Sequence, residues 1–190
     1  MVIKGEGGKL ADCPNVFLHN GKWYMMYVSN PGQGYETYLA VSDDLLKWTP
    51  LGKFDMYSNG KRADGSERIG MAVSKNMTRW TRYGSDPVID NASGNSGDPQ
   101  ITRIGDVWVM IYYGAFWKPK AFDTFACSYD MVTWTKWTGP HLVEPSVPFD
   151  NEFAHKPWMV FHNGVVYHFY CASGDQGRVI AVATSREINQ

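Results

Sequence analysis

Leu39-Ala40-Val41-Ser42-Asp43-Asp44-Leu45-Leu46-Lys47-Trp48-Thr49 is the stretch of sequence that decides the fold, because it recurs along the chain. Copies of the same form occupy residues 71–81 and 125–135, and a fourth copy at 182–188 lacks the last positions. Every copy runs from alternating apolar residues to a Ser, and an Asp, Asn or Glu follows two positions later. The complete copies end in Trp-Thr. The pattern predicts a strand, a tight turn at the acidic or amide residue, and a next strand that starts at the Trp.

A second pattern precedes three of these copies. Residues 12–27, 98–113 and 155–170 each contain an apolar segment led by Pro, a turn and an aromatic segment. Asn20-Gly21 and Asn163-Gly164 stand at two of these turns, and Asn-Gly between alternating apolar runs is the strongest short signal of a hairpin. Each of these sequence repeats is therefore predicted to form an antiparallel meander of four strands. Meanders that repeat every few tens of residues and stack radially form the blades of a β-propeller.

The composition describes a globular, core-forming chain. It has 190 residues, a formal net charge of -1 and 44% apolar residues. This charge gives no reason to expect nucleic acid or an anionic membrane as a partner, and no apolar run approaches the roughly 18 residues of a membrane span. Residues 1–8 lack the apolar core of a signal peptide, so the sequence leaves both a cytoplasmic and an exported location open. Cys13, Cys127 and Cys171 show no disulfide or zinc spacing and are expected to be small buried strand residues.

The spacing of the repeats is irregular. The Ser of the motif recurs after 32 positions, from Ser42 to Ser74, whereas the next two intervals are 54 and 57. Residues 54–60 and 67–72 resemble the second and third strands of a shortened blade. We expect one propeller domain over residues 1–190, with a blade at 10–54, a shortened blade at 55–90, a blade at 97–140 and an incomplete blade at 150–190. A closed propeller needs about four blades or more, so this count predicts a truncated or internally deleted propeller with open edges, or one that a second copy closes as a homodimer.

Several motifs resemble those of a known superfamily. They are Asp-Cys-Pro-Asn-Val-Phe at 12–17, Gly-Lys-Trp-Tyr-Met-Met-Tyr at 21–27, Gly-Asp-Pro-Gln-Ile at 97–101, and the Ser-x-Asp-x-x-x-Trp-Thr turn. Together they are similar to the five-bladed β-propeller glycosidases, which include glycoside hydrolase families 43, 32 and 62 and the family 130 phosphorylases. Residues 153–158 and 174–181 look most like bacterial family 43-like proteins. The resemblance implies an all-β fold, a partial (truncated) five-bladed β-propeller built of four-stranded antiparallel blades.

The resemblance also implies where the chemistry lies. In these folds the first residues of the innermost strands converge at one end of the central channel, and hydrolysis needs one protonated and one ionised carboxylate. Asp12 matches the acidic residue two positions before Pro, and Asp98 matches the Asp of the Asp-Pro motif. The third unit departs from the pattern, because Lys156 stands where an acidic residue is expected. Asp150 and Glu152 are the carboxylates nearest to Lys156 in the sequence, and we expect Glu152 to be the general acid.

These residues also have structural interpretations, which the sequence leaves open. An Asp before Pro commonly opens a turn, because its side chain caps the turn and Pro fixes φ, and this applies to Asp12 and Asp98. Lys156 could bind a substrate carboxylate, or phosphate if the reaction is phosphorolysis. It could equally form an ion pair with Glu152, which would argue against Glu152 as the acid. His155 fits a hydrogen bond to a sugar, a calcium ligand or a purely structural role.

Three more residues are candidate substrate contacts. Phe116 and Trp117 follow the second strand of their blade and fit either stacking on a sugar face or covering a blade edge. Arg178 fits contact with an anionic substrate or a solvated turn. No cofactor is expected, apart from the structural calcium ion that propellers of this type sometimes hold in the channel, and no zinc-ligand spacing or phosphate loop occurs in the sequence.

The resemblance implies a glycoside hydrolase of the family 43 type that uses carboxylate general acid and base catalysis. The expected partner is an oligosaccharide or glycoside substrate with a pentosyl linkage, arabinofuranosyl or xylosyl. By resemblance to family 43 the expected outcome is inversion, for which two carboxyl groups stand roughly 6.5–9.5 Å apart. Two alternatives stay open, a family 130-like glycoside phosphorylase and a non-catalytic carbohydrate-binding or inactive propeller fragment.

Overall fold

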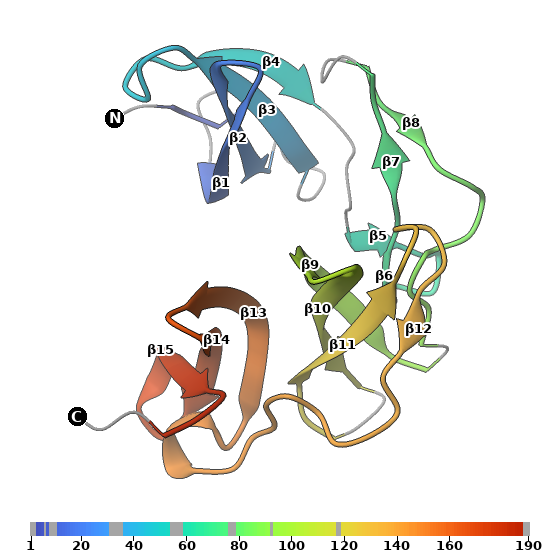
Figure 1. The fold of residues 1–190 in the computed structure, drawn as a ribbon, viewed down its shortest axis with the longest axis vertical. Helices are drawn as coiled ribbons and strands as arrows, with labels where there is room; N and C mark the ends of the chain where they lie inside the picture. The colour runs from blue at the N-terminus through green and yellow to red at the C-terminus, as the bar shows by residue number, and fades with distance from the viewer. Residues whose placement is uncertain are drawn as a thin grey trace. The chain divides into compact units, whose positions relative to one another are not determined.

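The computed structural model describes residues 3–5, 7, 11–30, 36–53, 59–75, 79–91, 93–116 and 119–187, and its main elements are β-strands (Figure 1). The first half of the chain contributes β1 (Ala11–His19), β2 (Lys22–Ser29), β3 (Glu36–Ser42), β4 (Thr49–Lys53), β5 (Asn59–Lys61), β6 (Glu67–Ile69), β7 (Ala72–Val73) and β8 (Thr81–Arg82). The second half contributes β9 (Asn95–Ile104), β10 (Val107–Ala115), β11 (Phe122–Ser128), β12 (Thr135–Lys136), the short 3-10 helix η2 (Pro148–Asp150), β13 (Phe153–His162), β14 (Val165–Gly174) and β15 (Gly177–Thr184). Within these described residues, no helix has the length and apolar character needed to cross a membrane.

The chain forms two compact units. The first contains residues 1–56 and 71–83, and the second contains residues 57–70 and 84–190. In the first unit, β1 to β4 form a four-stranded antiparallel sheet in chain order, and β7 pairs with β8. In the second unit, β9 to β12 form a sheet in the order β12-β11-β10-β9, β13 to β15 form a three-stranded sheet, and β5 pairs with β6. The all-β fold class with four-stranded antiparallel meanders, expected from the sequence, is confirmed.

The turn between β11 and β12 shows why the Ser-x-Asp motif recurs. The hydroxyl oxygen of Ser128 accepts hydrogen bonds from the backbone N–H groups of Asp130 (3.2 Å) and Met131 (2.9 Å). Asp130 Oδ1 accepts from the next two backbone N–H groups, at 2.8 and 2.7 Å. The indole nitrogen of Trp134 donates to the carbonyl of Met131 at 3.0 Å. The Ser and the Asp therefore satisfy four backbone donors of the turn, and the indole closes it.

The turn between β3 and β4 repeats the same bonds with Ser42, Asp44 and Trp48. The next strand begins at Thr49 in this unit and at Thr135 in the other, one position after the Trp. The prediction that the Trp starts the strand is therefore wrong by one residue. The physical reason is that the indole is bonded within the turn.

Both predicted Asn-Gly hairpins are confirmed. Asn20-Gly21 joins β1 to β2, and Asn163-Gly164 joins β13 to β14. The φ angles are 47° and 76° in the first turn, and 50° and 71° in the second. Positive φ at both central residues is the type I′ geometry, whose twist matches that of the two strands it connects.

The prediction of one strand over residues 67–72 is wrong. β6 ends at Ile69 and β7 begins at Ala72, and the two strands belong to different units. Ile69 forms an isolated antiparallel bridge with Ile89, so its backbone is held in the second unit. Most of the strand predicted over residues 54–60 lies outside the described residues. Cys13 is exposed and Cys127 half-buried, so only Cys171 meets the expectation of a buried cysteine.

Each unit has its own apolar core, built from alternate residues of neighbouring strands, as the period of two in a strand requires. In the first unit, Met25 and Tyr27 of β2 pack with Tyr38 and Ala40 of β3, and Trp48 covers them. The second unit has one cluster over β10 and β11 and another over β13 and β14, which consist of Ile69, Ile89, Met110, Tyr112 and Ala126, and of Ala154, Tyr170 and Ala172.

Candidate functional site

A bulge before proline repeats in the first strand of three sheets. Cys13, Asp98 and Lys156 each precede a Pro, and each has a positive φ, of 50°, 49° and 63°. The pairing register of β1, β9 and β13 shifts at these positions. Residues other than Gly rarely adopt a positive φ, and a following Pro restricts the backbone of the residue before it further. A β-bulge redirects a side chain out of the regular alternation, and such bulges are frequent beside functional sites.

The bulge residues of β9 and β13 meet in the second unit. Lys156 Nζ lies 3.8 Å from Asp98 Oδ2, and the two side chains remain 49% and 35% exposed. The sequence left open an ion pair of Lys156 with Glu152, and the structure instead places Lys156 beside Asp98. An acidic and a basic group stand side by side here, both accessible to a substrate.

Asp12 and Asp98 do not hold the same place in the bulge. Asp98 directly precedes Pro99, whereas Asp12 stands one position earlier, so the residue that matches Asp98 in the first unit is Cys13. Asp12 is exposed on β1, and its Oδ1 accepts a hydrogen bond from the backbone N–H of Cys13 at 2.8 Å. This bond is local to the bulge, which favours the structural interpretation of Asp12.

Tyr113 connects Asp98 with a carboxylate that the sequence did not point to. Its hydroxyl donates a hydrogen bond to Glu67 Oε2 at 2.6 Å. Burial, the hydrogen bond to Glu67, and the negative charges of Glu67 and Asp98 all raise the pKa of Tyr113. The phenol therefore lies under the influence of two carboxylates. Glu67 precedes no Pro and lies in no repeated motif, and only the packing of β6 against β9 brings it to this place.

His155 is buried beneath these groups. Its ring lies edge-on to Tyr113, with 5.9 Å between centroids, and 5.7 Å from the ring of Phe153. Burial, followed by the positive charge of Lys156, lowers the pKa of His155, so the imidazole is neutral at neutral pH. Its Nδ1 is buried and has no hydrogen-bond partner among the described residues. Buried polar atoms are rarely left unpaired, and Nδ1 of His155 is one of four such atoms among the described side chains.

Glu152 and Arg178 lie on either side of Ser173 in the last sheet. The hydroxyl of Ser173 donates to Glu152 Oε2 at 3.1 Å, and its carbonyl accepts from the N–H of Glu152 at 2.9 Å. Arg178 is the partner of Ser173 in the register of β14 and β15. Both charged side chains are exposed. The charge of Arg178 contributes to the lowered pKa of His155, so Arg178 lies within electrostatic reach of this ring.

Two other Asp residues of the second unit are buried supports. Asp150 Oδ1 accepts two backbone N–H groups of the preceding segment, each at 2.8 Å, and its Oδ2 accepts the hydroxyl of Tyr170 at 3.0 Å. Asp123 Oδ2 lies 2.9 Å from His168 Nε2 and joins β11 to β14. Burial, opposed by the hydrogen bond with His168, raises the pKa of Asp123 to about 7. The exposed fractions of Asp150 and Asp123 are 1% and 0%, so neither carboxylate meets a substrate.

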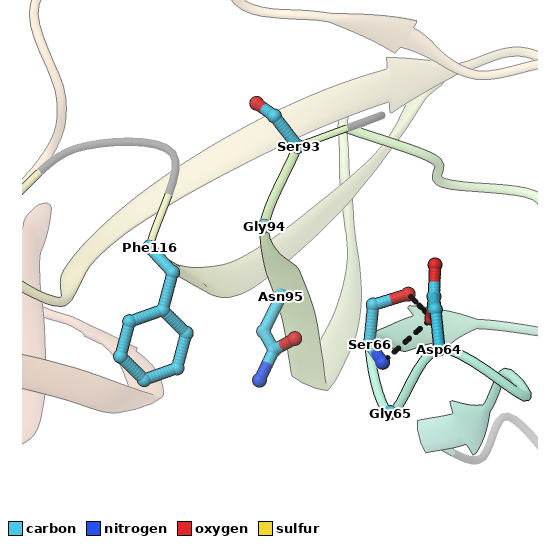
Figure 2. Close-up of a pocket in the computed structure, with 7 residues that line it drawn as sticks. All are labelled: Asp64, Gly65, Ser66, Ser93, Gly94, Asn95 and Phe116. Carbon is cyan, nitrogen blue, oxygen red and sulfur yellow. Dashed lines mark hydrogen bonds between the residues drawn. The ribbon is translucent and has the colours of Figure 1, made fainter.

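A pocket of about 410 Å³ lies at the start of β9 (Figure 2). The turn between β5 and β6, the residues that lead into β9, and the residue after β10 form its walls. Phe116 is its aromatic wall and is 72% exposed. Trp117, the neighbouring candidate, lies outside the described residues. The backbone N–H of Glu67 donates to Asn95 Oδ1 at 2.9 Å, which connects the pocket with the carboxylate beside Tyr113.

A metal site has no candidate ligand set in the described part of the chain. No group of three or more His, Cys, Asp or Glu side chains comes together there. The candidate site instead consists of carboxylates, a neutral imidazole, a phenol and an ammonium group, which can bind sugar hydroxyls and transfer protons.

Comparison with known proteins gave matches at the level of structure. No model of a protein family matches the chain, and no curated protein matches it. A solved structure described as a BT0996 RGII complex is 27% identical, with a TM-score of 0.64, over 100% of this chain and 91% of the other. A structure named only as a glycoside hydrolase is also 27% identical, with a TM-score of 0.63 and the same coverage. A thermostable family 43 glycoside hydrolase is 17% identical, with a TM-score of 0.71, over 97% of this chain and 71% of its own.

These structures and further matches of the family 32, family 130 and arabinanase types are five-bladed β-propeller proteins. The chain therefore has, at the level of structure, the fold of that glycosidase superfamily, as part of a propeller. The fold predicted from the motifs is confirmed.

Proposed function

We propose that this protein hydrolyses a glycosidic bond, with a pentosyl residue as the sugar that is released. The observation that carries the proposal is the meeting of Asp98 and Lys156, 3.8 Å apart, at matching bulges of two first strands. The glycoside hydrolase fold supports it, because sites of this fold class lie where the first strands of the blades begin.

Hydrolysis by inversion assigns each carboxylate one proton transfer. Asp98 takes a proton from water while the water oxygen forms a bond with the anomeric carbon. The glycosidic carbon–oxygen bond breaks in the same step, and Glu152 gives its proton to the leaving oxygen. Asp12 lies in the first unit, and its role as a third acidic group stays a prediction from the sequence. Glu67 is an alternative to Glu152 as the acid, because it lies next to Tyr113 and half-buried.

The other groups bind substrate. Lys156 and the buried imidazole of His155 hydrogen-bond to sugar hydroxyls near Asp98, and Phe116 stacks on a sugar ring. Arg178, exposed on the last sheet, contacts the glycan outside the reacting ring.

The proposal is tested with a panel of pentosides that includes nitrophenyl α-arabinofuranoside, nitrophenyl β-xyloside, arabinotriose and xylotriose. The wild-type protein is expected to hydrolyse at least one of them without added phosphate. Asp98→Asn is expected to lower kcat by roughly 10²–10⁴, the usual contribution of a general acid or base. Asp106→Asn is the matched control, because the Asp106 side chain is 98% exposed. It lies at the turn between β9, the strand that carries Asp98, and β10. A folded wild-type protein that cleaves none of these substrates contradicts the proposal, and cleavage that requires inorganic phosphate makes the protein a phosphorylase.

The general acid is identified by its leaving-group dependence. A nitrophenolate leaves without a proton, whereas a sugar alkoxide needs one. Replacement of the acid therefore slows cleavage of the trisaccharide much more than that of the nitrophenyl pentoside. Glu152→Gln is expected to show this difference, and Glu67→Gln is not. The reverse result assigns the acid to Glu67.

A further inference from the structure

The pocket at the start of β9 differs in its chemistry from the Asp98–Lys156 pair. The residues that line it share small or polar side chains apart from one aromatic ring, and they are Asp64, Gly65, Ser66, Ser93, Gly94, Asn95 and Phe116 (Figure 2). None of these seven described residues is basic. Its volume, about 410 Å³, lies in the range of roughly 300–1,000 Å³ that is common for small-molecule sites.

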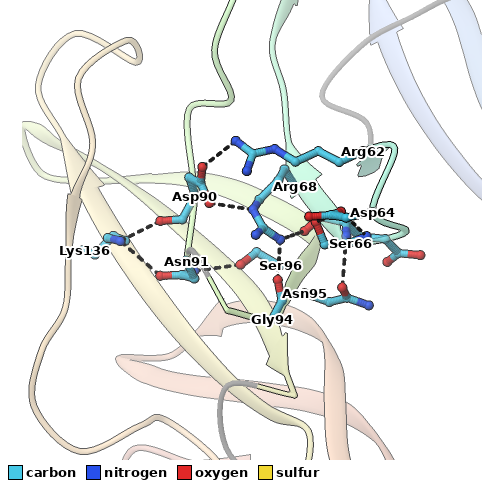
Figure 3. Close-up of polar contacts among 11 residues, drawn as sticks. Arg62, Asp64, Ser66, Arg68, Asp90, Asn91, Gly94, Asn95, Ser96 and Lys136 are labelled. Atoms are coloured by element: carbon cyan, nitrogen blue, oxygen red, sulfur yellow. Dashed lines mark hydrogen bonds and ion pairs between the residues drawn. The ribbon is translucent and has the colours of Figure 1, made fainter.

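A buried guanidinium holds the two polar walls of this pocket together. The Arg68 side chain is 3% exposed, and its Nε lies 2.6 Å from Asp90 Oδ1. Its Nη1 donates to the carbonyl of Glu67 at 2.8 Å and to the carbonyl of Gly94 (Figure 3). Glu67 follows the turn between β5 and β6, and Gly94 precedes β9. One side chain therefore fixes both segments of backbone that shape the pocket.

The polar groups at the walls are also fixed by hydrogen bonds. Asn95 Oδ1 accepts the N–H of Glu67 at 2.9 Å, so the amide nitrogen of Asn95 is the end that remains as a donor. Asp64 Oδ1 accepts the N–H of Ser66 at 2.9 Å and its hydroxyl at 2.6 Å. Binding groups that are ordered in advance lose less conformational freedom when a molecule binds.

Three described basic side chains near the pocket are engaged elsewhere. Arg62 and Arg68 both bind Asp90, each at 2.6 Å, and Lys136 donates to the backbone carbonyl of Asp90 at 2.7 Å (Figure 3). An anionic group in the pocket meets the carboxylate of Asp64 without a cation among the lining residues, which disfavours it. An uncharged sugar instead finds hydroxyl, amide and carboxylate partners, with an aromatic face for its C–H groups.

We infer that this pocket is a subsite for an uncharged sugar ring, stacked on Phe116 and hydrogen-bonded by Asn95. The inference rests on the proposed function and deepens it. Asn95 and Asp98 lie on the same strand, β9, and Glu67 connects Asn95 with Tyr113, so the subsite borders the proposed general base. It selects glycans with a neutral ring beside the cleaved bond and rejects those with a uronic acid there.

The test is a calorimetric binding titration of the whole chain with arabinotriose, xylotriose and trigalacturonate. Asp98→Asn serves as the protein that binds without turnover. Phe116→Ala is the test variant, and Phe161→Ala is its matched control, because Phe161 is 74% exposed on β13 and outside the pocket. Asp98→Asn is expected to bind at least one neutral trisaccharide and to bind trigalacturonate at least tenfold more weakly. Adding Phe116→Ala is expected to weaken the neutral binding about tenfold, as loss of an aromatic contact does, and adding Phe161→Ala to leave it unchanged.

Three outcomes overturn the inference: no binding of either neutral trisaccharide, equal losses with Phe116→Ala and Phe161→Ala, or tighter binding of trigalacturonate. The failure of the subsite and that of the proposed function are separate results. Neutral binding that depends on Phe116, without cleavage of any pentoside by the wild type, leaves the subsite and removes the hydrolase. Cleavage that Phe116→Ala does not slow at low substrate concentration leaves the hydrolase and removes the subsite.

Discussion

Asp98 and Lys156 occupy the same place in two successive sheets, each directly before a Pro and each with positive φ, and their side chains meet at 3.8 Å. A strained backbone at one such position costs on the order of 1–3 kcal/mol. Its recurrence in β1, β9 and β13 indicates that the bulge belongs to the blade design. What varies is the residue that the bulge presents, which is a thiol, a carboxylate and an ammonium group.

Lys156→Met is expected to lower kcat/KM by roughly tenfold to a hundredfold, because it removes the positive charge beside Asp98 from the reacting region. The free energy of unfolding is expected to change by less than about 1 kcal/mol, since both partners are partly exposed. Pentoside hydrolysis and urea unfolding measure the two effects. Lys22→Met is the control, because Lys22 forms an exposed ion pair with Asp43 in the first unit. Equal activity of the two variants contradicts a role for the Asp98–Lys156 pair.

Arg68→Met is expected to destabilise the protein by about 3 kcal/mol or more, because it leaves Asp90 and two carbonyl groups without their buried partner. Arg62→Met is the matched control. Arg62 binds the same carboxylate at the same distance of 2.6 Å, but its side chain is 44% exposed against 3% for Arg68. Its loss is therefore expected to cost about 1 kcal/mol or less. Urea unfolding of both variants measures the difference, and similar losses would show that burial does not decide the strength of this pair.

Ser128→Ala is expected to lower the free energy of unfolding by about 1–2 kcal/mol, since it removes a buried hydroxyl that accepts two backbone bonds and donates to Asp130. Ser185→Ala is the comparison at the same motif position, where the hydroxyl is exposed and, among the described residues, accepts a bond from the N–H of Val166. Its cost is expected to be smaller. Thermal unfolding of both variants tests the order, and the opposite order would remove the capping explanation of the motif.

The contribution of Asp123 to the free energy of unfolding is expected to fall as the pH rises from about 4 to about 7. The pKa of this carboxyl is 3.8 in the unfolded chain and about 7 in the folded one. In this interval the folded state holds more protons than the unfolded state, so the contribution is fully present below pH 3.8 and is lost as the pH passes 7. Its size is on the order of 4 kcal/mol.

Asp123→Asn tests this pH dependence, because an amide cannot ionise. Its unfolding free energy, measured by urea titration between pH 4 and pH 8, is expected to vary less with pH than that of the wild type. Asp106→Asn, at an exposed turn, is expected to keep the wild-type slope. An unchanged slope in Asp123→Asn would show that the buried carboxylate does not titrate in this range.

The local elements of the fold could be read from the sequence because their causes lie within a few residues. The Asn-Gly hairpins follow from the positive φ that Asn and Gly accept. The Ser-x-Asp turns follow from side chains that bond the backbone two or three positions ahead, as Ser128 does. The boundary between β6 and β7 was misplaced because its cause is distant, namely the bridge between Ile69 and Ile89.

The candidate site was predicted only in part for the same reason. Asp98 and Lys156 were found because each precedes a motif Pro, and Phe116 because it follows an aromatic strand. Glu67 has no such signal, since its partner Tyr113 lies 46 residues away. The sequence did not show that Cys13, rather than Asp12, takes the place of Asp98 in the bulge, because the pattern of acidic residue and Pro does not state which position carries the bulge.

The sequence by itself determined the strands, the turns and the repetition of the blade, because period-two burial and local hydrogen bonds are written in neighbouring residues. Only the tertiary structure decided which side chains face one another: Lys156 with Asp98, Glu67 with Tyr113, and Phe116 with the turn around Ser66. These meetings depend on how separate sheets pack and on the direction in which each bulge turns a side chain, and no local pattern encodes either.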